Sequence, residues 1–244
     1  MSTPIQTEQP TQTPGHGRVT KGDRIREKYS DENSIRYKLR EARSRHVKGI
    51  IDTIYASNGS CRIVDIGGEE NYWRVFGYDY LSARNVTITL VNLNRTETTE
   101  PMINAVVGDG CDMPFADNSF DLAHSNSVVE HVGSWEKMVA FADEVVRLAP
   151  SYFVQTPNFW FPYEPHLSTP LIHYLPKTIQ AKLALKLQLN AETKMNSRAD
   201  ADDFIKHNSM LSYRQMRKLF PDCEILRERF LGITKSLMAI KPPR

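Results

Sequence analysis

The chain has 244 residues, and its 31 lysines and arginines against 29 aspartates and glutamates give a formal net charge of +2. Such a balance does not suggest a dedicated nucleic-acid binder, which needs an excess of positive charge. With 40% hydrophobic and 25% charged residues, the composition is that of a globular protein and excludes a fibrous or wholly disordered chain. No apolar run is long enough to span a bilayer.

Cysteine content and the start of the chain bear on the compartment. Cys61, Cys111 and Cys223 are scattered and fit neither a disulfide framework nor the spacing of a zinc site. The first residues show no basic segment followed by an apolar core, the pattern of a secretion signal. We therefore expect a cytoplasmic protein.

The first 60 residues divide into a polar tail and a basic helix. Residues 1–20 are rich in Thr, Gln and Pro, which predicts a disordered tail. Residues 21–60 are predicted to be a helical segment, because apolar residues recur every three or four positions between residues 30 and 57. Residues 18–48 hold 11 basic and 5 acidic residues, which form either a solvated helix face or a surface for an anionic partner.

Strand and helix patterns alternate between residues 61 and 156. Apolar, β-branched segments predict strands, and helical periodicity predicts helices between them. This alternation is typical of βαβ units, in which helices cover both faces of a parallel sheet. We therefore predict a doubly wound α/β core over residues 61–156. The expected strands are 61–66, 86–93, 103–108, 120–125 and 152–156, and the expected helices are 71–83 and 134–148.

The pattern changes after Thr156. Residues 157–210 contain five prolines and many aromatic side chains and are too long for a plain connection, so we expect a lid insertion that forms a binding pocket. Within it, residues 182–189 favour a basic amphipathic helix that either packs on the domain or touches a membrane. Residues 211–244 are expected to complete the core with a helix at 212–220 and an antiparallel strand pair at 224–230 and 234–240.

A pair of glycines follows the first predicted strand directly. Gly67 and Gly68 allow the backbone to approach a ligand closely, and the start of the next helix offers unpaired N–H groups. In a doubly wound sheet the ligand lies at the carboxyl ends of the strands. A tight strand-to-helix turn would have the same sequence, and the absence of G-x-G-x-x-G disfavours a dinucleotide site.

Three further segments follow in order along the chain: Met113-Pro114-Phe115, Ser119-Phe120-Asp121 and Glu130-His131-Val132. Together with the Asp65-Ile66-Gly67-Gly68 segment, they resemble class I S-adenosylmethionine-dependent methyltransferases of the small-molecule type over residues 62–156. The resemblance implies a Rossmann-like, seven-stranded sheet, to which the N-terminal helix and the lid insertion are added. It also implies S-adenosyl-L-methionine as the cofactor.

The resemblance implies cofactor contacts at the ends of four strands. Asp109 matches the acid that accepts a hydrogen bond from the adenine amino group, as a carboxylate is able to do. The glycine turn and the end of the fourth strand match positions beside the methionine moiety, and Asn92 matches the position beside the ribose. The residues concerned are Asp65, Gly67, Gly68, Asn92, Asp109, Gly110, Cys111, Ser125 and Asn126.

Two departures from the family pattern affect this cofactor site. Glu69-Glu70-Asn71 replaces the later part of the family's longer glycine run, and Asn92 replaces an acid that binds both ribose hydroxyls. An amide can still hydrogen-bond a hydroxyl, but without the assistance of a charge. These departures leave room for a non-catalytic cofactor-binding module.

Methyl transfer to a hydroxyl needs a group that accepts one proton. A histidine has a suitable pKa and a carboxylate can orient it. We therefore expect His166 and His131 to be catalytic, with Glu164 as an orienting residue or second base, although His131 could instead have a structural role at a helix start. The histidines and Glu164 lack a familiar metal-ligand spacing, so we expect no metal.

The sequence predicts a methyltransferase that transfers a methyl group to a small molecule, most readily at an oxygen, by in-line displacement. The aromatic insertion and the lack of a strongly basic groove favour a small acceptor. The alternatives are the non-catalytic module and a methyltransferase that acts on RNA or a lipid. We expect no nucleic-acid partner, peripheral membrane contact is less favoured, and the sequence does not indicate the oligomeric state.

Overall fold

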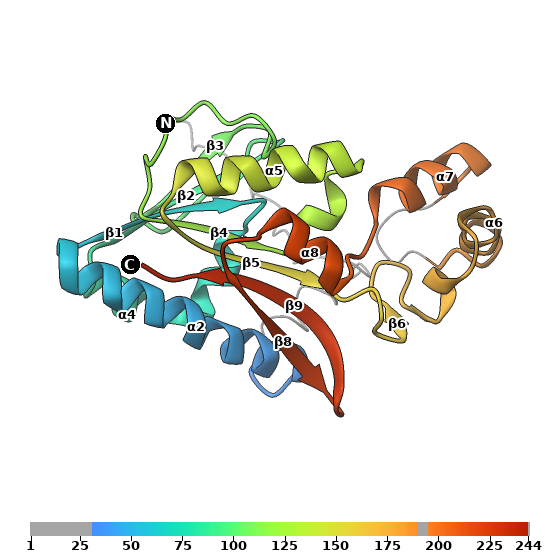
Figure 1. Ribbon diagram of the computed structural model, residues 1–244, viewed down its shortest axis with the longest axis horizontal. Coiled ribbons are helices and arrows are strands. Elements are labelled where there is room, and N and C mark those ends of the chain that lie inside the picture. Colours follow the sequence, from blue (N-terminus) through green and yellow to red (C-terminus); the bar gives the residue numbers. More distant parts are fainter. Residues whose placement is uncertain (1–30, 190–194, 244) are drawn as a thin grey trace, which may run out of the picture.

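The computed structural model describes residues 31–189 and 195–243, so the predicted tail at residues 1–20 lies outside the described residues. Seven strands form one sheet in the order β3-β2-β1-β4-β5-β9-β8 (Figure 1). This order confirms the predicted doubly wound, Rossmann-like sheet. The strands are β1 Cys61–Ile66, β2 Val86–Asn92, β3 Ile103–Val107, β4 Leu122–Asn126, β5 Ser151–Pro157, β8 Glu224–Phe230 and β9 Ile233–Lys241.

The strand order reverses next to β1. The chain pairs β1 with β2 on one side and with β4 on the other, and all these pairings are parallel. The carboxyl ends of β1 and β4 therefore border the crevice in which doubly wound sheets bind their ligands. β9 runs antiparallel to both β5 and β8, which closes the sheet with the predicted C-terminal strand pair.

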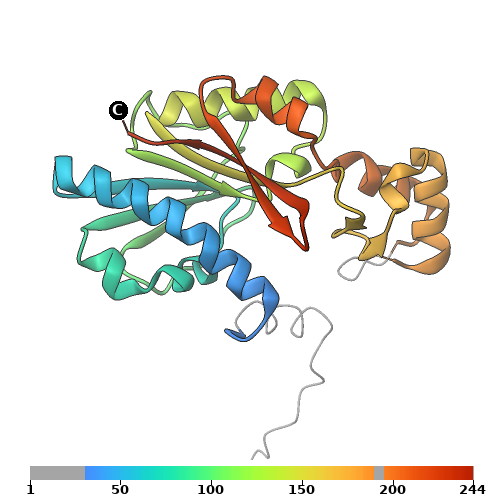
Figure 2. The ribbon, with the colours of Figure 1, turned by 60° about the horizontal axis from the view of Figure 1, so that its bottom comes forward.

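Helices cover both faces of the sheet (Figures 1 and 2). α2 (Ile35–Asn58) lies along one face, while α5 (Trp135–Leu148) and α8 (Tyr213–Leu219) cover the other. Each face has its own apolar cluster: Val47 and Ile51 of α2 are fully buried on one side, and Phe141 and Val145 of α5 on the other. The sheet is thus buried on both faces, as its nearly continuous apolar strands require.

The single helix predicted at residues 71–83 is wrong. The structure has three short pieces instead, α3 (Glu70–Trp73), η1 (Arg74–Phe76) and α4 (Tyr78–Ser82). Gly77 breaks the helix because its φ of +80° lies outside the helical region. Trp73 and Phe76 are buried in the cluster on the α2 side of the sheet, and this burial holds the short turns in place.

Residues 157–210, called the insertion below, leave the sheet after β5. They form a hairpin of β6 (Tyr163–Glu164) and β7 (Thr169–Pro170), followed by η3 (Ile172–Tyr174), α6 (Lys177–Leu187) and α7 (Arg198–His207). The insertion projects beyond the carboxyl end of β5 (Figures 1 and 2). Its two longer helices pack through an apolar cluster of their own, which includes Ala181, Ala184 and Ile205.

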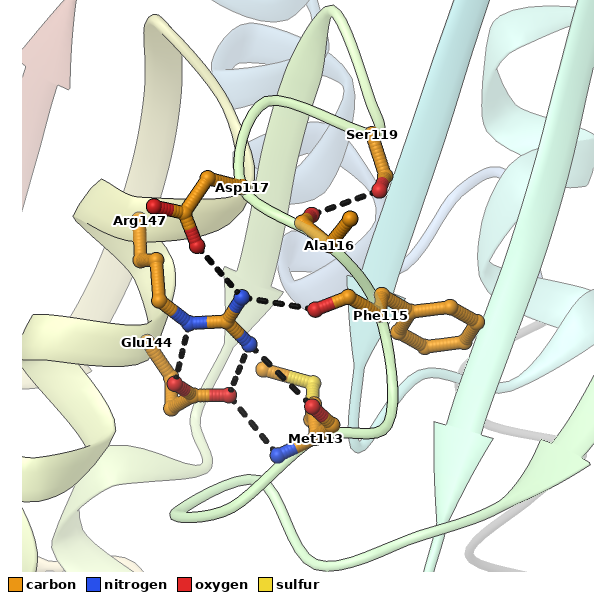
Figure 3. Close-up of polar contacts among 7 residues, drawn as sticks. All are labelled: Met113, Phe115, Ala116, Asp117, Ser119, Glu144 and Arg147. Carbon is orange, nitrogen blue, oxygen red and sulfur yellow. Dashed lines mark hydrogen bonds and ion pairs between the residues drawn. The ribbon is translucent and has the colours of Figure 1, made fainter.

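Arg147 of α5 fastens the loop between β3 and β4 (Figure 3). The guanidinium donates to the backbone oxygens of Met113 and Phe115, at 3.1 and 2.6 Å, and to the carboxylate of Asp117 at 2.9 Å. Glu144 accepts from the same guanidinium and from the Met113 N–H at 2.7 Å. The loop is therefore ordered by polar groups that come from one helix.

We expect Arg147→Ala to lower the free energy of unfolding by about 1–3 kcal/mol, because Glu144 and two loop carbonyls lose their donor. Urea unfolding followed by circular dichroism measures the change. Arg198→Ala is the matched control, since Arg198 makes an exposed ion pair with Asp202 whose loss should leave the urea midpoint unchanged. Equal effects of the two substitutions would contradict the role of Arg147.

Candidate functional site

The crevice begins at the glycine turn that follows β1. Gly67 has a φ of +71°, a conformation that side chains other than glycine rarely adopt. A Cβ at Gly67 would lie 2.5 Å from Cγ2 of Val128, which follows the end of β4. Glycine therefore permits the loop after β4 to close over the turn after β1.

Asp65 lies beneath this turn. Its side chain is 1% exposed, and its carboxylate accepts a hydrogen bond from Nε1 of Trp73 at 2.8 Å. Nδ1 of His124 lies 2.7 Å from the other carboxylate oxygen. A Cβ at Gly68 would collide with the carboxylate, so Gly68 rests directly on it. Asp65 thus positions the turn, and a direct contact with the cofactor stays a prediction.

Asn92, at the end of β2, also holds the glycine turn. Its Nδ2 donates to the backbone oxygen of Gly68 at 2.9 Å. An ionised acid at this position could not donate this hydrogen bond, so the amide creates a link between β2 and the turn. Asn92 is half-buried at the edge of the crevice, and its contact with the ribose stays a prediction.

The turn after β3 is pressed against the end of β1. Oδ1 of Asp109 accepts from the Cys111 N–H at 2.9 Å, which closes the turn locally. A Cβ at Gly110 would lie 2.8 Å from Cγ2 of Ile66 and 3.2 Å from the Phe141 ring, so glycine allows this close approach. The structure therefore places Asp109, Gly110 and Cys111 beside the glycine turn, with the Asp109 residue exposed.

The end of β4 supplies polar atoms to the same crevice. Ser125 is buried, and its hydroxyl donates to the backbone oxygen of Ile66 at 3.1 Å. Oδ1 of Asn126 is buried and has no hydrogen-bond partner among the described residues. Because an unpaired buried acceptor is costly, the amino group of a methionine moiety is a suitable partner for it. The glycine turns and this acceptor fit S-adenosylmethionine.

The three side chains predicted to be catalytic lie together at the ends of β4 and β5. His131 ends the short helix η2 (Val129–His131), and His166 lies in the β6–β7 hairpin. Their rings meet edge to face with centroids 4.7 Å apart. Oε1 of Glu164 lies 2.6 Å from Nδ1 of His166, and its Oε2 accepts from the N–H of Leu167. This geometry favours the orienting role of Glu164.

Glu130 and Thr156 belong to the same cluster, although the sequence analysis did not single them out as site residues. Glu130 is fully buried, and its Oε2 accepts from Oγ1 of Thr156 at 2.9 Å. Its Oε1 has no hydrogen-bond partner in the described part of the chain. Burial raises the pKa of Glu130 to about 7. The position of Glu130 directly before His131 was the available signal.

His131 is neutral near pH 7 in this setting. Desolvation by the surrounding protein, together with the positive charge that His166 carries when protonated, lowers the pKa of His131 to about 4. The residue is nevertheless exposed in part. A neutral imidazole presents one nitrogen lone pair, so His131 is able to accept a hydrogen bond or bind a cation.

An aromatic cavity of about 420 Å³ lies in the insertion beside this cluster. Glu164 lines the cavity together with Phe159, Trp160, His173 and Phe204. Its volume is within the roughly 300–1,000 Å³ that is usual for small-molecule sites. Nε2 of His173 lies 3.0 Å from the backbone oxygen of Phe159, so this histidine packs in the cavity wall and does not join the cluster.

Residues 59–150 match the sequence model of a family described as a methyltransferase domain. The matched range begins just before β1 and ends just before β5, so it covers the glycine turn, Asn92, the Asp109 turn and the end of β4. Residues 59–150 are therefore a methyltransferase domain, of the class I S-adenosylmethionine-dependent type. S-adenosylmethionine is the cofactor of this class of domain, and its binding in the crevice described above stays a prediction.

The relatives found by sequence are short matches. Two uncharacterized proteins, from two strains of Mycobacterium tuberculosis, are each 38% identical to this chain over 55 residues. The matched stretch is 22% of this chain and 19% of each relative, so it spans about a fifth of the length of these curated relatives.

The similarity of this chain to solved structures is low, both in sequence identity and in TM-score. The magnesium protoporphyrin IX methyltransferase of Synechocystis PCC 6803, with bound SAH, is 12% identical and has a TM-score of 0.46 over 90% of this chain and 94% of that one. The phosphoethanolamine N-methyltransferase 2 of Haemonchus contortus is 13% identical, with a TM-score of 0.45 over 69% of this chain and 35% of that one. Neither similarity carries an argument about the function of this chain.

We expect Gly67→Ala to lower the free energy of unfolding by about 2–4 kcal/mol, because it adds strain at positive φ and drives a methyl group into Val128. The double variant with Val128→Ala should recover part of this loss. Gly59→Ala isolates the strain, since Gly59 has the same φ of +71° with nothing within 4 Å of an added Cβ. Urea unfolding measures all variants, and strict additivity of the two single changes would contradict the contact.

Proposed function

We propose that this methyltransferase transfers a methyl group to an oxygen of a small-molecule acceptor. The proposal is carried by the contact between His131 and His166, with Glu164 behind His166, at the strand ends beside the glycine turn. The aromatic cavity shares Glu164 with this cluster. One side of the cluster thus borders the cofactor crevice, and the other side borders a pocket for an acceptor.

Residues from several strand ends would hold S-adenosylmethionine. Asp109 would accept a hydrogen bond from the adenine amino group, and Asn126 would accept one from the amino group of the methionine moiety. Asn92 would border the ribose while its own amide holds the glycine turn. The bound cofactor supplies a methyl group that its sulfonium makes electrophilic.

The histidine cluster orients the acceptor and removes the proton from its hydroxyl. When Nδ1 of His166 carries a hydrogen, it donates a hydrogen bond to Oε1 of Glu164, and Nε2 then has the lone pair that can accept from a hydroxyl. Nε2 takes the hydroxyl proton as the acceptor oxygen becomes methylated, and the Glu164 carboxylate stabilises the imidazolium that results. The proton then passes to solvent water, which restores the neutral ring.

The lining of the cavity favours a compact acceptor that has both apolar or aromatic surface and polar groups. Phe159, Trp160 and Phe204 supply the apolar surface, and Gln180 and Asn208 supply hydrogen-bonding groups. His166 and Glu164 lie at one end of the cavity, where they could remove a proton from an acceptor. A hydroxyl needs this help, whereas a group that is already a good nucleophile does not, so the pair favours a hydroxyl acceptor.

A lipid acceptor is the second candidate, and the outer surface of the insertion favours it. Exposed apolar side chains and lysines occur together between residues 171 and 187, a composition that suits an anionic membrane. No helix in the described ranges has the length and apolar content that crossing a membrane requires, so such contact would be peripheral. The exposed side chains concerned are Leu171, Leu175, Ile179 and Leu187, with Lys182 and Lys186.

Titration calorimetry with S-adenosylhomocysteine tests the cofactor site. We expect saturable binding that Asp109→Ala weakens about 10–100-fold, because a charge-assisted hydrogen bond is lost. Asp109→Asn retains an oxygen that can close the turn at Cys111, so it separates loss of charge from loss of the turn. Equal binding by all three proteins would overturn the site, and no binding by the unaltered protein would overturn the proposed function.

In a methyl-transfer assay, we expect His166→Ala to lower kcat for a hydroxyl acceptor by about 10²–10⁴-fold with little change in affinity for S-adenosylhomocysteine. Glu164→Gln should have a smaller effect, because an amide oxygen still accepts from Nδ1. His46→Ala, at an exposed position of α2, is the matched control and should keep full activity.

The acceptor panel contains soluble hydroxyl compounds and, as a separate arm, hydroxyl lipids in anionic phospholipid vesicles. Turnover confined to the vesicle arm would replace the soluble acceptor with a lipid. Cofactor binding without turnover in either arm would favour a non-catalytic module.

A further inference from the structure

We propose that Glu130, His131 and His166 together bind a divalent transition-metal ion of the Zn²⁺ type at the ends of β4 and β5. One carboxylate oxygen and two imidazole nitrogens from these residues all lie within 4.8 Å of one another. The proposal rests on the proposed function, because it concerns the same cluster and the same acceptor hydroxyl. It revises the expectation of no metal, which was based on sequence spacing alone.

The donor set is that of a catalytic metal site. Two imidazoles and one carboxylate are the protein ligands of several catalytic zinc centres, and they leave a position open for a water or a substrate oxygen. Metal–ligand distances of about 2.1 Å place tetrahedral ligands about 3.4 Å apart. The separations within the cluster therefore have to shorten by up to about 1.4 Å, which side-chain rotation of His131 and His166 is able to provide.

The unpaired oxygen of Glu130 is a second, independent observation. Glu130 is fully buried, and its Oε1 has no hydrogen-bond partner among the residues that the structure describes. Burying a carboxylate oxygen without a partner is costly, and a cation coordinated by it removes this cost. Thr156 holds the other oxygen at 2.9 Å, so the orientation of the carboxylate is already set.

Glu164 and His166 form the arrangement that commonly supports a metal-bound histidine. A carboxylate on Nδ1 of the ring leaves Nε2 as the ligand atom and fixes the orientation of the ring. Oε1 of Glu164 lies 2.6 Å from Nδ1 of His166, and the N–H of Leu167 holds its other oxygen. In this arrangement Glu164 is a positioning residue for the metal ligand.

A cation at this place changes how the acceptor loses its proton. A hydroxyl that binds to a divalent cation has a lower pKa than the free hydroxyl, so its proton leaves to solvent water. The oxygen would keep the electron pair that forms the new bond to the methyl carbon, while the bond from that carbon to the sulfonium sulfur breaks and its electron pair stays on sulfur. S-adenosylhomocysteine would leave as the neutral thioether, and nothing is oxidised or reduced. A histidine that coordinates the metal through Nε2 has no lone pair left to act as the base. With the ion bound, this route therefore replaces proton transfer to His166, which applies to the metal-free protein.

Metal binding to the untagged, full-length chain tests this inference without any acceptor. We expect Zn²⁺, in competition with a chromophoric chelator, to bind at one ion per chain, and Co²⁺ to give the visible absorption of a low-coordinate site. Glu130→Gln and His166→Asn should each weaken Zn²⁺ binding at least tenfold, and Glu164→Gln about 10–100-fold. His46→Ala, an exposed histidine on α2, should leave binding unchanged.

No Zn²⁺ binding by the unaltered protein, or equal binding by all variants, would overturn the metal site. Circular dichroism checks the fold of each variant, and His166→Asn in the half-buried hairpin carries the test if Glu130→Gln does not fold. S-adenosylhomocysteine titration of the same proteins separates the two proposals. Zn²⁺ binding without cofactor binding would refute the proposed function alone, and cofactor binding without Zn²⁺ binding would refute the metal site alone.

Discussion

A buried carboxylate beneath the glycine turn is the constraint on which the cofactor crevice depends. Asp65 is 1% exposed, and a charge in such a place is tolerated only with close polar partners. Trp73 and His124 supply them from α3 and β4, so three elements are held in one arrangement around β1. Gly68 rests on the same carboxylate, and the position of the turn therefore follows from the position of a single side chain.

This arrangement extends across the sheet to the acceptor side. His124 stacks on Phe153 of β5 with ring centroids 5.5 Å apart and planes within 5° of parallel. The same strand carries Thr156, whose hydroxyl donates to Glu130. The cofactor turn and the histidine cluster are thus linked through packed rings and one strand, which fixes the distance between the two halves of the site.

Local patterns in the sequence were sufficient to predict the sheet and most helices. Strand periodicity, the serine cap before α5 and the glycine after the first strand all act within a few residues, so one chain reveals them. The break at Gly77 was missed because the apolar residues on either side keep a helical spacing, and only their burial as separate turns shows otherwise. Sequence patterns within a few residues also do not show whether a glycine adopts a positive φ.

The candidate site was predicted in part for the same reason. His131, His166 and Glu164 follow predicted strands and carry suitable chemistry, so their types and places were informative. The link from Asn92 to Gly68 and the role of Glu130 depend on contacts between segments far apart in the chain. No local pattern encodes such contacts. Asn92 departs from the family pattern, which has an acid at this position. Its side-chain amide nevertheless supports the glycine turn.

The insertion is attached to the core by two strands of chain that lie side by side, not by a single tether. Asn158, where the chain leaves, pairs with Leu211, where it returns, and the N–H of Phe159 donates to the Leu211 oxygen at 2.9 Å. The returning segment also donates from the N–H of Ser209 to the backbone oxygen of Glu130. Because two paired segments connect the insertion to the core, the insertion resists twisting as well as bending relative to the sheet. Exchange of the insertion between related proteins, as a route to a new acceptor, would have to carry both connecting segments together, because the two segments pair with each other.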